Sequence, residues 1–406
     1  MKKKPFDYGY VVVAASTIIL MVGFGTYYSY TIFFDSLSVE FNSAKGAISG
    51  AFSIAVLVSG LISIIAGRTS DRLGPKVVSI FCGSALGLGF LLMSLVHSVW
   101  QVYLLYGIFL ATGVGGLFPA AVSTVARWFT GKRGMMIGIV TAGLGLGSII
   151  FSPLISHFIL AYGWRKAYLI IGVIVLGVIL SASQLLKRGP EPTGLAADIK
   201  KVAPKITTPD ARDFTYRQAI RTRQFWMLAV MYLLSGYGQF SLMVHIVPYA
   251  TGLGISPISA ASILSVIGAS SIFGRVIIGG IGDRMRVKPL LIAILATLFI
   301  SLAWLEFARN LWVLVGVGII FGLGYGGSST LQSLVAVEMF GLSTMGVMLG
   351  NFIFSICIGG SVGPVLTGVL YDVSDSYRLA FSICAITAFA CLVLVLWLTP
   401  PKKPIN

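Results

Sequence analysis

The sequence predicts an all-α membrane protein in which twelve transmembrane helices form two similar six-helix halves. Three observations support this prediction. Of the 406 residues, 57% are hydrophobic and 10% are charged, and the mean hydropathy is +0.94, whereas ordinary soluble domains carry about 25% charged residues. Because about 20 apolar residues cross a bilayer, the chain has room for roughly ten to twelve spans. Finally, the apolar segments form two sets, and motifs of the first set recur in the second at nearly the same offset along the chain.

Apolar runs separated by short charged or turn-rich stretches predict where each span begins and ends. The predicted spans of the first half are 9–34, 47–66, 76–97, 100–128, 134–160 and 165–187. Those of the second half are 224–250, 259–281, 288–308, 311–339, 344–371 and 377–399. The chain is therefore expected to divide into an N-terminal bundle (1–187), a linker (188–223) and a C-terminal bundle (224–406). Several prolines and mixed charges favour a linker over a further domain.

The distribution of lysine and arginine predicts the orientation of the chain. With both termini in the cytoplasm, 23 of the 29 cations fall in cytoplasmic segments, 5 fall outside, and Arg275 lies within a span. The positive-inside rule favours this arrangement, so we expect a multi-pass protein of the inner (plasma) membrane. The same distribution accounts for the net charge of +16, and nucleic acid is not an expected partner.

Several other classes of protein are disfavoured by what the spans contain. The four cysteines lie in apolar runs without disulfide or zinc spacing, and neither a metal nor another cofactor is expected: Cys82, Cys357, Cys384 and Cys391. The glycine cluster at 143–147 follows no predicted strand, so it does not indicate a dinucleotide site. No nucleophile and base pair up within the spans, and an enzyme is not expected. The first apolar run is too long for a signal peptide.

Two motifs occur twice in the sequence at nearly the same offset. The stretch from Gly67 to Lys76 recurs from Gly279 to Lys288, a shift of 212 residues, and the glycine-rich stretch 113–116 recurs at 324–327, a shift of 211. This repetition indicates a duplicated unit. Two parallel repeats related by an axis along the membrane normal are typical of alternating-access transporters, whose substrate site lies between the repeats near the midplane.

These motifs resemble those of a known family. The pattern Gly67-x-x-x-Asp71-Arg72-x-Gly74-x-Lys76 resembles the loop motif between helices 2 and 3 of the major facilitator superfamily, and the resemblance covers nearly the whole chain. Four shorter stretches resemble its monocarboxylate transporter and oxalate/formate antiporter branch: Tyr30 to Asp35, Arg127 to Phe129 with Lys132 to Gly134, Gly163 to Arg165, and Arg223 to Trp226. The resemblance implies the major facilitator fold.

The repeated loop motif is interpreted as a gate. Glycine permits close helix approach, and Asp71 can bond a neighbouring helix end or a basic side chain, which would latch the cytoplasmic side while the outside is open. The assigned gating residues are Gly67, Asp71, Arg72, Gly74 and Lys76, with Asp283 and Arg284 in the second copy. Arg286 stands where the first copy has Gly74, which makes the second latch different. The alternative is a short loop that merely follows the positive-inside rule.

Arg275 is the strongest candidate for substrate binding. A mid-helix arginine costs about 2.5 to 3.5 kcal/mol on insertion scales and normally has a partner, yet all thirteen carboxylates fall at helix ends, in loops or in the linker. A substrate carboxylate, gripped by two parallel hydrogen bonds, would supply the missing counter-ion. The alternatives are bonding to backbone carbonyls and snorkelling to the surface. The resemblance also implies a substrate-binding arginine at this place in the eighth helix.

Aromatic and small residues are expected to surround the anion. The predicted substrate-binding set is Arg275, Tyr28, Phe118, Leu144, Ser271, Tyr325 and Cys357. One cation with aromatic walls suits a short carboxylate with a small apolar part. The eleventh span contains no Lys or Arg, whereas the resemblance implies a second cation there in oxalate antiporters, near Cys357. For any one tyrosine, helix packing or an interfacial position is the alternative.

The mode of coupling is left open. Lactate transporters of the animal type carry a lysine where this chain has Tyr28 and an aspartate where it has Ser271, so the resemblance does not supply their proton-coupling residues. His245 is the only histidine well inside a predicted span near the other half, and it is a candidate proton site because a histidine titrates near pH 6.5. A histidine that only packs in the core is the alternative.

We therefore expect a secondary active transporter of a small monocarboxylate, resembling lactate or pyruvate, that works by alternating access with proton coupling or anion exchange. One alternative is a dicarboxylate antiporter of the oxalate/formate type. A second is an exporter of another small molecule, such as a drug or a sugar, although proton-driven members of those groups usually carry acids within their spans. A third is a receptor that binds the same anion without moving it.

Overall fold

The computed structural model describes residues 8–42, 45–189 and 214–401, and the regular elements of these ranges are helices. Twelve helical segments are long and apolar enough to cross a membrane. The six of the first half are α1 (Tyr8–Tyr28), α3 (Lys45–Leu73), α4 (Pro75–Met93), the continuous run of α5 (Val99–Leu104), η1 (Leu105–Leu110) and α6 (Ala111–Trp128), α7 (Arg133–Tyr162) and α8 (Trp164–Gln184). The six of the second half are α11 (Arg223–Gly252), α12 (Pro257–Gly282), α13 (Val287–Leu305), α14 (Leu311–Phe340), α15 (Met345–Ser374) and α16 (Arg378–Leu396).

The predicted fold class is confirmed, and most span boundaries agree to within a few residues. The first span is an exception, because 9–34 was expected and α1 ends at Tyr28. The helix is interrupted at Ser29, whose hydroxyl donates to the Gly25 carbonyl (2.7 Å), and a shorter helix, α2 (Tyr30–Glu40), follows. The second span is longer than predicted because Asp71 and Arg72 remain helical.

Short connections join successive spans and have clear local causes. Several helices of the second half begin at a residue whose side-chain oxygen accepts the backbone N–H three positions on, which satisfies a donor that the helix leaves free: Thr222 for Phe225, Ser256 for Ser259, and Asn310 for Val313. Between α7 and α8 the turn is a single residue, Gly163, at φ +80°. A residue with a Cβ would be strained at that φ.

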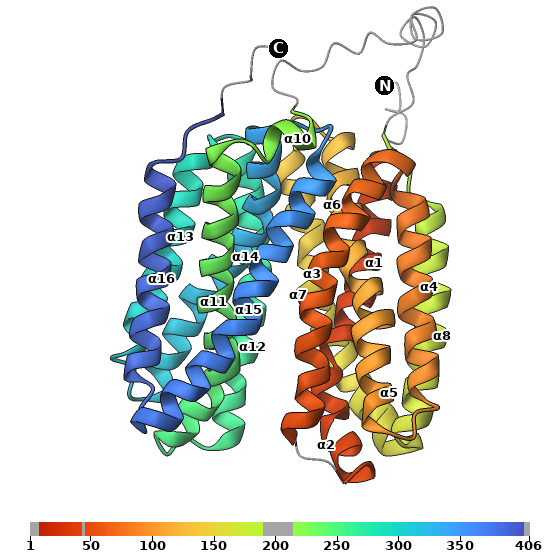
Figure 1. Cartoon of the computed structure of the whole chain (residues 1–406), viewed down its shortest axis with the longest axis vertical. Coiled ribbons are helices and arrows are strands. Elements are labelled where there is room, and N and C mark those ends of the chain that lie inside the picture. Colours follow the sequence, from red (N-terminus) through yellow and green to blue (C-terminus); the bar gives the residue numbers. More distant parts are fainter. Residues whose placement is uncertain (1–7, 43–44, 190–213, 402–406) are drawn as a thin grey trace, which may run out of the picture.

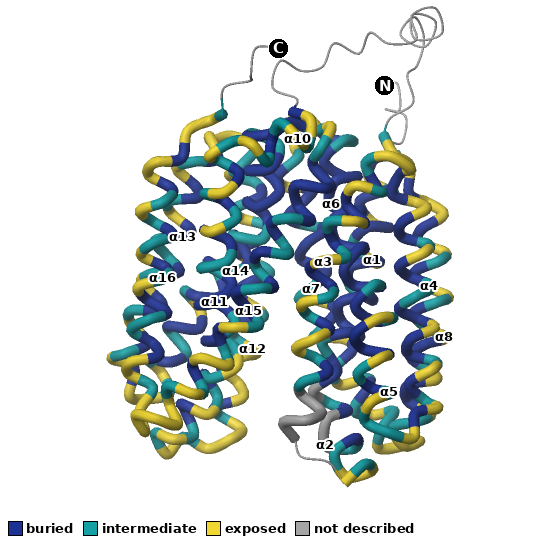
Figure 2. The backbone as a smooth tube through the Cα atoms, in the orientation of Figure 1, coloured by how far each residue is buried: buried dark blue, intermediate teal, exposed yellow. Residues whose placement is uncertain are grey.

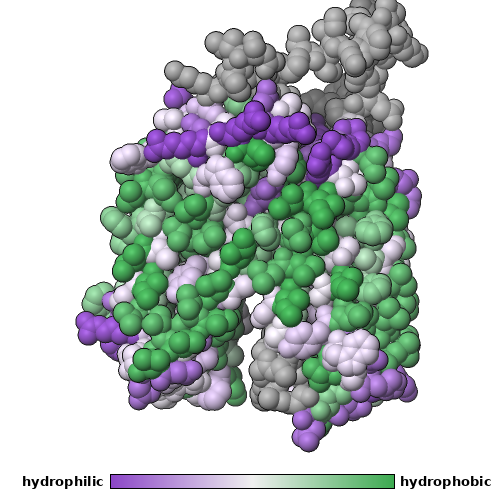
Figure 3. Space-filling model, viewed as in Figure 1, coloured by the Kyte–Doolittle hydropathy of each residue, from purple (hydrophilic) through white to green (hydrophobic). Residues whose placement is uncertain are grey.

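The two halves stand side by side, meet near one end and separate toward the other (Figure 1). We call the end that contains the start of α1 and the end of α16 the closed face, and the opposite end the open face. The space-filling view shows a hollow between the halves at the open face (Figure 3). On the face in view, a wide apolar band crosses the molecule and a hydrophilic rim lies at the closed face, as expected for a bilayer-spanning protein.

Contacts between the halves are mainly those of α3 with α15 and of α7 with α12, and smaller contacts join α7 to α14 and α6 to α15. Glycines make close approaches: a Cβ on Gly67 would overlap the backbone of Gly346, and a Cβ on Gly134 would overlap that of Gly279. Along α3 and α15, Gly60 also packs against Cys357. Nearer the open face, residues of these helices are more exposed (Figure 2). Close packing of small residues is the usual way that membrane helices associate.

The predicted linker, 188–223, lies largely outside the described residues, which resume at Phe214. The Phe214 backbone N–H donates to the Phe340 carbonyl (3.0 Å), and the two rings pack edge to face. A short helix, α10 (Tyr216–Ala219), then begins with a capping box formed by Thr215 and Gln218. The described end of the linker is therefore attached to the closed-face end of α14.

Candidate functional site

Arg275 lies on α12, near the place where the halves begin to separate, and its residue is only 3% exposed. Its Nε donates to the Ser329 hydroxyl of α14 (3.2 Å), and its Nη1 donates to the Ser271 hydroxyl one turn earlier on α12 (2.7 Å). Each serine in turn donates to a carbonyl of its own helix, Gly326 for Ser329 and Gly268 for Ser271, both at 2.7 Å. Two neutral acceptors therefore orient the guanidinium without neutralising it.

The charge of Arg275 has no acidic partner in the described part of the chain. Among the described residues, ion pairs join Arg127 to Asp71 and Arg165 to Glu40, and none involves Arg275. A guanidinium carries five N–H donors, and the two serines use one on Nε and one on Nη1. Both Nη nitrogens therefore keep a donor free of protein acceptors among these residues. The free donors on the two Nη nitrogens have the spacing that binds a carboxylate through two parallel hydrogen bonds.

Tyr325 of α14 provides an aromatic wall beside the arginine. The guanidinium carbon lies 5.6 Å from the centre of the Tyr325 ring, within the range of an attractive cation–π contact. The ring is stacked nearly parallel on Phe321, with centroids 6.1 Å apart. Because Phe321 is fully buried, it holds Tyr325 in place beside the charge.

Tyr28 brings the N-terminal half to the same site. It lies close enough to Arg275, Tyr325 and Cys357 to interact electrostatically with all three. Its ring packs against Phe24 (5.8 Å), which packs edge to face against Phe118 of α6 (6.3 Å). The interruption at Ser29 follows directly, so Tyr28 is the last residue of α1. The two halves thus place an aromatic lining and a cation together.

The remaining predicted substrate residues lie close to the interface between the halves. Cys357 of α15 is 7% exposed and packs against Gly60 of α3. Leu144 of α7 is partly buried against the core, and its neighbour Gly145 faces Arg275 more directly: a Cβ there would lie 3.8 Å from Nη1. Ser271 accepts from Arg275 and donates to its own helix, so its hydroxyl positions the arginine.

A hydroxyl pair crosses the interface beside the backbone of Arg275. Thr141 of α7 and Thr330 of α14 lie 3.3 Å apart, and the Thr330 hydroxyl is within 3.3 Å of the Arg275 carbonyl. A Cβ on Gly138 of α7 would overlap that same carbonyl. The backbone of Arg275 is therefore part of the contact between the halves, while its side chain belongs to the site.

His245 lies away from this site, and its contacts are within its own half. On α11, its Nε2 lies 2.9 Å from the Pro364 carbonyl and its Nδ1 lies 3.3 Å from the Tyr377 hydroxyl. These contacts do not place it beside the other half, because α11 packs most closely on α15 and α16. A carbonyl can only accept, so Nε2 carries a hydrogen and Tyr377 donates to Nδ1 in the neutral ring.

At the closed face, two aspartates bridge the halves in matching ways. Asp71 of α3 accepts from the backbone N–H groups of Gly346 (3.2 Å) and Val347 (3.0 Å) at the start of α15. We call this set, with Gly67, the first joint. Asp283, which follows α12, accepts from the N–H groups of Gly134 (2.6 Å) and Met135 (3.0 Å) at the start of α7.

We call the Asp283 contacts, with Gly279, the second joint. Both joints use free donors at a helix N-terminus, where the helix dipole also favours a negative charge. The first joint has an additional ion pair, because Arg127 binds Asp71.

Arg72, Lys76 and Arg284 are the other predicted gating cations. Arg72 and Arg284 are exposed, and no ion pair with a described carboxylate involves any of the three. Gly74 takes φ +98° before α4, whereas Arg286 precedes α13 at φ −63°.

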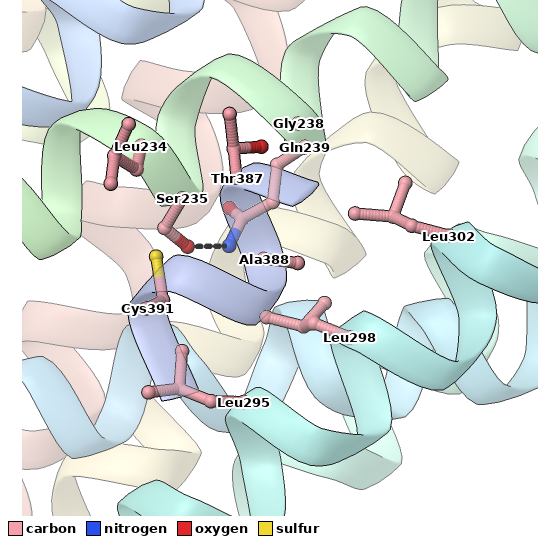
Figure 4. A pocket seen from close by; sticks show the side chains of 10 residues that line it. All are labelled: Leu234, Ser235, Gly238, Gln239, Leu295, Leu298, Leu302, Thr387, Ala388 and Cys391. Carbon is pink, nitrogen blue, oxygen red and sulfur yellow. Dashed lines mark hydrogen bonds between the residues drawn. The ribbon is translucent and has the colours of Figure 1, made fainter. Parts of the chain in front are cut away.

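A small cavity lies inside the C-terminal half, between α11, α13 and α16 (Figure 4). Its lining includes Ser235 and Gln239 and none of the predicted substrate residues, so it is distinct from the Arg275 site. Among the residues that the structure describes, no three His, Cys, Asp or Glu side chains gather as a metal site would require.

Four residues of the site were missed by sequence reasoning: Phe24, Gly145, Phe321 and Ser329. Ser329 is 54 residues from Arg275, and one serine among many gives no signal for such a contact. Phe24 is adjacent to residues that were singled out on the first span, and its spacing of one turn from Tyr28 could have identified it.

Comparisons with known proteins agree with this architecture. The family model described as Major Facilitator Superfamily matches residues 15–364 and, a second time, 286–406. Monocarboxylate transporter 13 of Rattus norvegicus is 28% identical over 378 residues, covering 92% of this chain and 85% of that protein. The oxalate:formate antiporter of Oxalobacter formigenes is 27% identical over 401 residues, covering 96% and 91% respectively.

Solved structures extend the likeness to the fold. The E. coli fucose:proton symporter FucP aligns with a TM-score of 0.72 and 15% identity, over 96% of this chain and 99% of that chain. At this identity the likeness concerns the fold alone. The matched family model, the twelve spans and the paired six-helix halves lead to one conclusion: the chain belongs to the major facilitator superfamily, a family of membrane transporters.

Proposed function

We propose that the protein is a secondary active transporter of a small monocarboxylate, such as lactate or pyruvate, which binds between the two halves at Arg275. One observation carries the proposal: a buried guanidinium keeps free donors on both Nη nitrogens and has no acidic partner among the described residues. An unpaired buried charge is strongly unfavourable. A bound anion would remove that cost, and the relatives that are named monocarboxylate transporters make a carboxylate the natural choice.

The site favours a single negative charge on a short, partly apolar molecule. Tyr28 is close to Cys357 as well as to Arg275, and Cys357 stands where a second cation would be needed, so a second carboxylate would remain unpaired in a low-dielectric site. Tyr325, Tyr28 and Phe118 would pack against a small apolar part. Oxalate remains the competing substrate because one relative is an oxalate:formate antiporter.

We further propose that the closed face is cytoplasmic, since it bears most of the cations. The structure would then represent an outward-open state, in which the first and second joints seal the inside. The residues proposed to work as the gate are those of both joints. Substrate binding would favour approach of the halves at the open face, and opening of the joints would then release the anion inside.

Coupling by proton symport or by anion exchange is compatible with the site. For symport, His245 is the proposed proton group, because Tyr377 can donate to neutral Nδ1 and accept from it after protonation. For exchange, a second anion would bind Arg275 on the return step. The two modes differ in one observable: only symport makes uptake of the anion rise with an inward proton gradient.

The decisive experiment uses purified protein in liposomes that contain unlabelled anion and receive labelled lactate, pyruvate, formate or oxalate outside. We expect uptake of monocarboxylates, and we expect Arg275→Lys to reduce it by at least about tenfold, since a lysine cannot supply the paired donors. Ser329→Ala is the matched variant: it retains the cation and loosens its orientation, so a smaller loss is expected. Unchanged uptake by Arg275→Lys would refute the site, and selective oxalate uptake would refute the monoanion assignment.

A further inference from the structure

A seam of polar side chains runs through the interior of the C-terminal half. Tyr237, Ser241 and His245 succeed one another at intervals of four along α11, so they lie on one face of that helix. This face packs on α15: a Cβ on Gly363 would lie 2.6 Å from the Ser241 hydroxyl, and His245 contacts the Pro364 carbonyl. None of these contacts involves the substrate site.

Three hydroxyls in the seam lack a hydrogen bond of regular geometry. Those of Tyr237, Ser241 and Thr367 are buried, and none makes a well-formed bond with a described residue. Their weaker contacts are with one another and with one thiol: Thr367 is within bonding range of Tyr237 and of Cys384, and Cys384 is also within range of Ser241. Buried polar groups are nearly always well bonded to protein or to ordered water, so these poorly bonded hydroxyls favour hydration of the interior.

The small cavity described above lies next to this seam, beyond Cys384. It has a volume of about 10 Å³, close to the smallest space that holds one water molecule. Gln239, which is 5% exposed, donates from Nε2 to the Ser235 hydroxyl (2.7 Å; Figure 4). The Thr387 hydroxyl donates to the Cys384 carbonyl (2.8 Å). Three leucines, Leu295, Leu298 and Leu302, close the remaining walls.

The polar side chains that line the cavity keep both hydrogen-bond donors and hydrogen-bond acceptors without a partner among the described residues. Ser235 accepts from Gln239, and its own hydrogen has no acceptor in the described part of the chain. Thr387 donates its hydrogen and so keeps lone pairs that can accept. The Gln239 carboxamide has two donors and two acceptor positions, of which one donor is used. A buried water needs two to four polar partners, and this cavity offers three.

We propose that the cavity binds an ordered water molecule through Ser235, Gln239 and Thr387, and that the seam continues this hydration to His245. The water accepts from Ser235 and donates to Thr387 and Gln239. Hydration would thus connect the core of the C-terminal half to a titratable side chain without passing through the substrate site. This inference does not depend on which anion is transported.

Two matched glycine substitutions test the proposal. A Cβ on Gly238 would lie 3.1 Å from Leu302 and 3.5 Å from the Thr387 hydroxyl, so Gly238→Ala fills the cavity with little displacement. A Cβ on Gly177 of α8 would have no neighbour within 4 Å, so Gly177→Ala is the control. Both substitutions add the same intrinsic helix preference, and they differ in whether the added methyl group enters the cavity.

The first measurement is X-ray radiolytic footprinting of the full chain in nanodiscs, which labels side chains beside bound water. We expect rapid labelling of Cys391 and Tyr237, unchanged in Gly177→Ala and at least several-fold slower for Cys391 in Gly238→Ala. If Cys391 in the parent protein is labelled no faster than buried residues far from polar groups, or if Gly238→Ala leaves its rate unchanged, the proposed water is absent.

The second measurement is the thermal midpoint of unfolding of the same proteins. With a bound water, Gly238→Ala strands the three polar partners, and its midpoint falls below that of Gly177→Ala. In a dry cavity, Gly238→Ala gains packing, and its midpoint rises above that of the control. A rise of this kind would overturn the proposal even if the variant retained full transport activity.

Discussion

The first and second joints share a backbone plan and differ in charge. In each, an aspartate accepts two N–H groups at the start of a helix of the other half, and two glycine backbones touch beside it. Arg127 then binds Asp71 in the first joint. The corresponding residue of the second half, 211 positions later, is Glu338, which accepts instead from the Val287 N–H (3.2 Å).

The difference in charge between the joints shows that two properties have separate sources: glycines allow the helices to approach closely, and the charged side chains determine how strongly each joint is held. Glycines and helix ends recur in both halves because two helices can meet closely only where side chains are absent. The charges have diverged, so Asp71 is held by an ion pair and two amides, whereas Asp283 depends on two amides. We expect the second joint to be the weaker and to open first.

The largest effect is expected from blocking the glycine contacts themselves. A valine at Gly67 or Gly279 would overlap the backbone of the opposite half, so Gly67→Val and Gly279→Val should prevent the closed face from sealing and abolish transport. Gly280→Val is the control, because a Cβ there has no neighbour within 4 Å. Uptake into liposomes measures the loss. Similar activity of Gly279→Val and Gly280→Val would show that close approach at the second joint is not required.

A smaller and unequal effect is expected from the aspartates. Asp71→Asn removes charge-assisted bonds, each worth on the order of 1.5 to 3 kcal/mol, and leaves Arg127 unpaired. Asp283 has no ion pair among the described residues, so Asp283→Asn leaves no described cation without its partner. Opening of the closed face should therefore increase more for Asp71→Asn, by about tenfold or more. Alkylation of a cysteine introduced at Thr141, which is buried between the halves, reports this opening. Equal effects of the two substitutions would remove the proposed difference in strength.

The smallest effect is expected from making the first joint resemble the second. Arg127→Gln eliminates the ion pair but leaves Asp71 bonded to the N–H groups of Gly346 and Val347. The guanidinium is largely buried, with 15% of its side-chain surface accessible, but Asp71 keeps its two amide partners, so the loss should be smaller than in Asp71→Asn. In the alkylation assay, Arg127→Gln should fall between the parent and Asp71→Asn. An opening as large as that of Asp71→Asn would contradict this ranking.

Composition and periodicity were enough to predict the fold because the bilayer permits few solutions. Apolar length determined each span, and most boundaries fell within a few residues of the structure. The end of α1 was wrong because apolar residues continue past Ser29. The interruption is a local change of backbone geometry at Ser29, and a hydropathy pattern contains no information about such a change.

The candidate site could be predicted in part, because charged residues are rare within membrane spans and therefore stand out in the sequence. Arg275 is conspicuous because a charge within a span is uncommon, and its lack of an acidic partner followed from locating every carboxylate in the sequence. Ser329 and Phe321 could not be inferred, since apolar and hydroxyl residues are frequent in spans. The position of His245 was also misjudged: sequence places a residue along a helix but does not reveal which neighbour its face meets.

Arg275 unites two roles in a single residue, because its side chain faces the proposed anion site while its carbonyl packs on Gly138 of the opposite half. From Arg275 to Gly279 and Asp283, α12 is continuous helix over about two turns, so this segment should move as one rigid unit. A displacement of Arg275 on binding of the proposed anion would therefore also displace Gly279 and Asp283. Occupancy of the site would then be coupled directly to the second joint through the helix backbone.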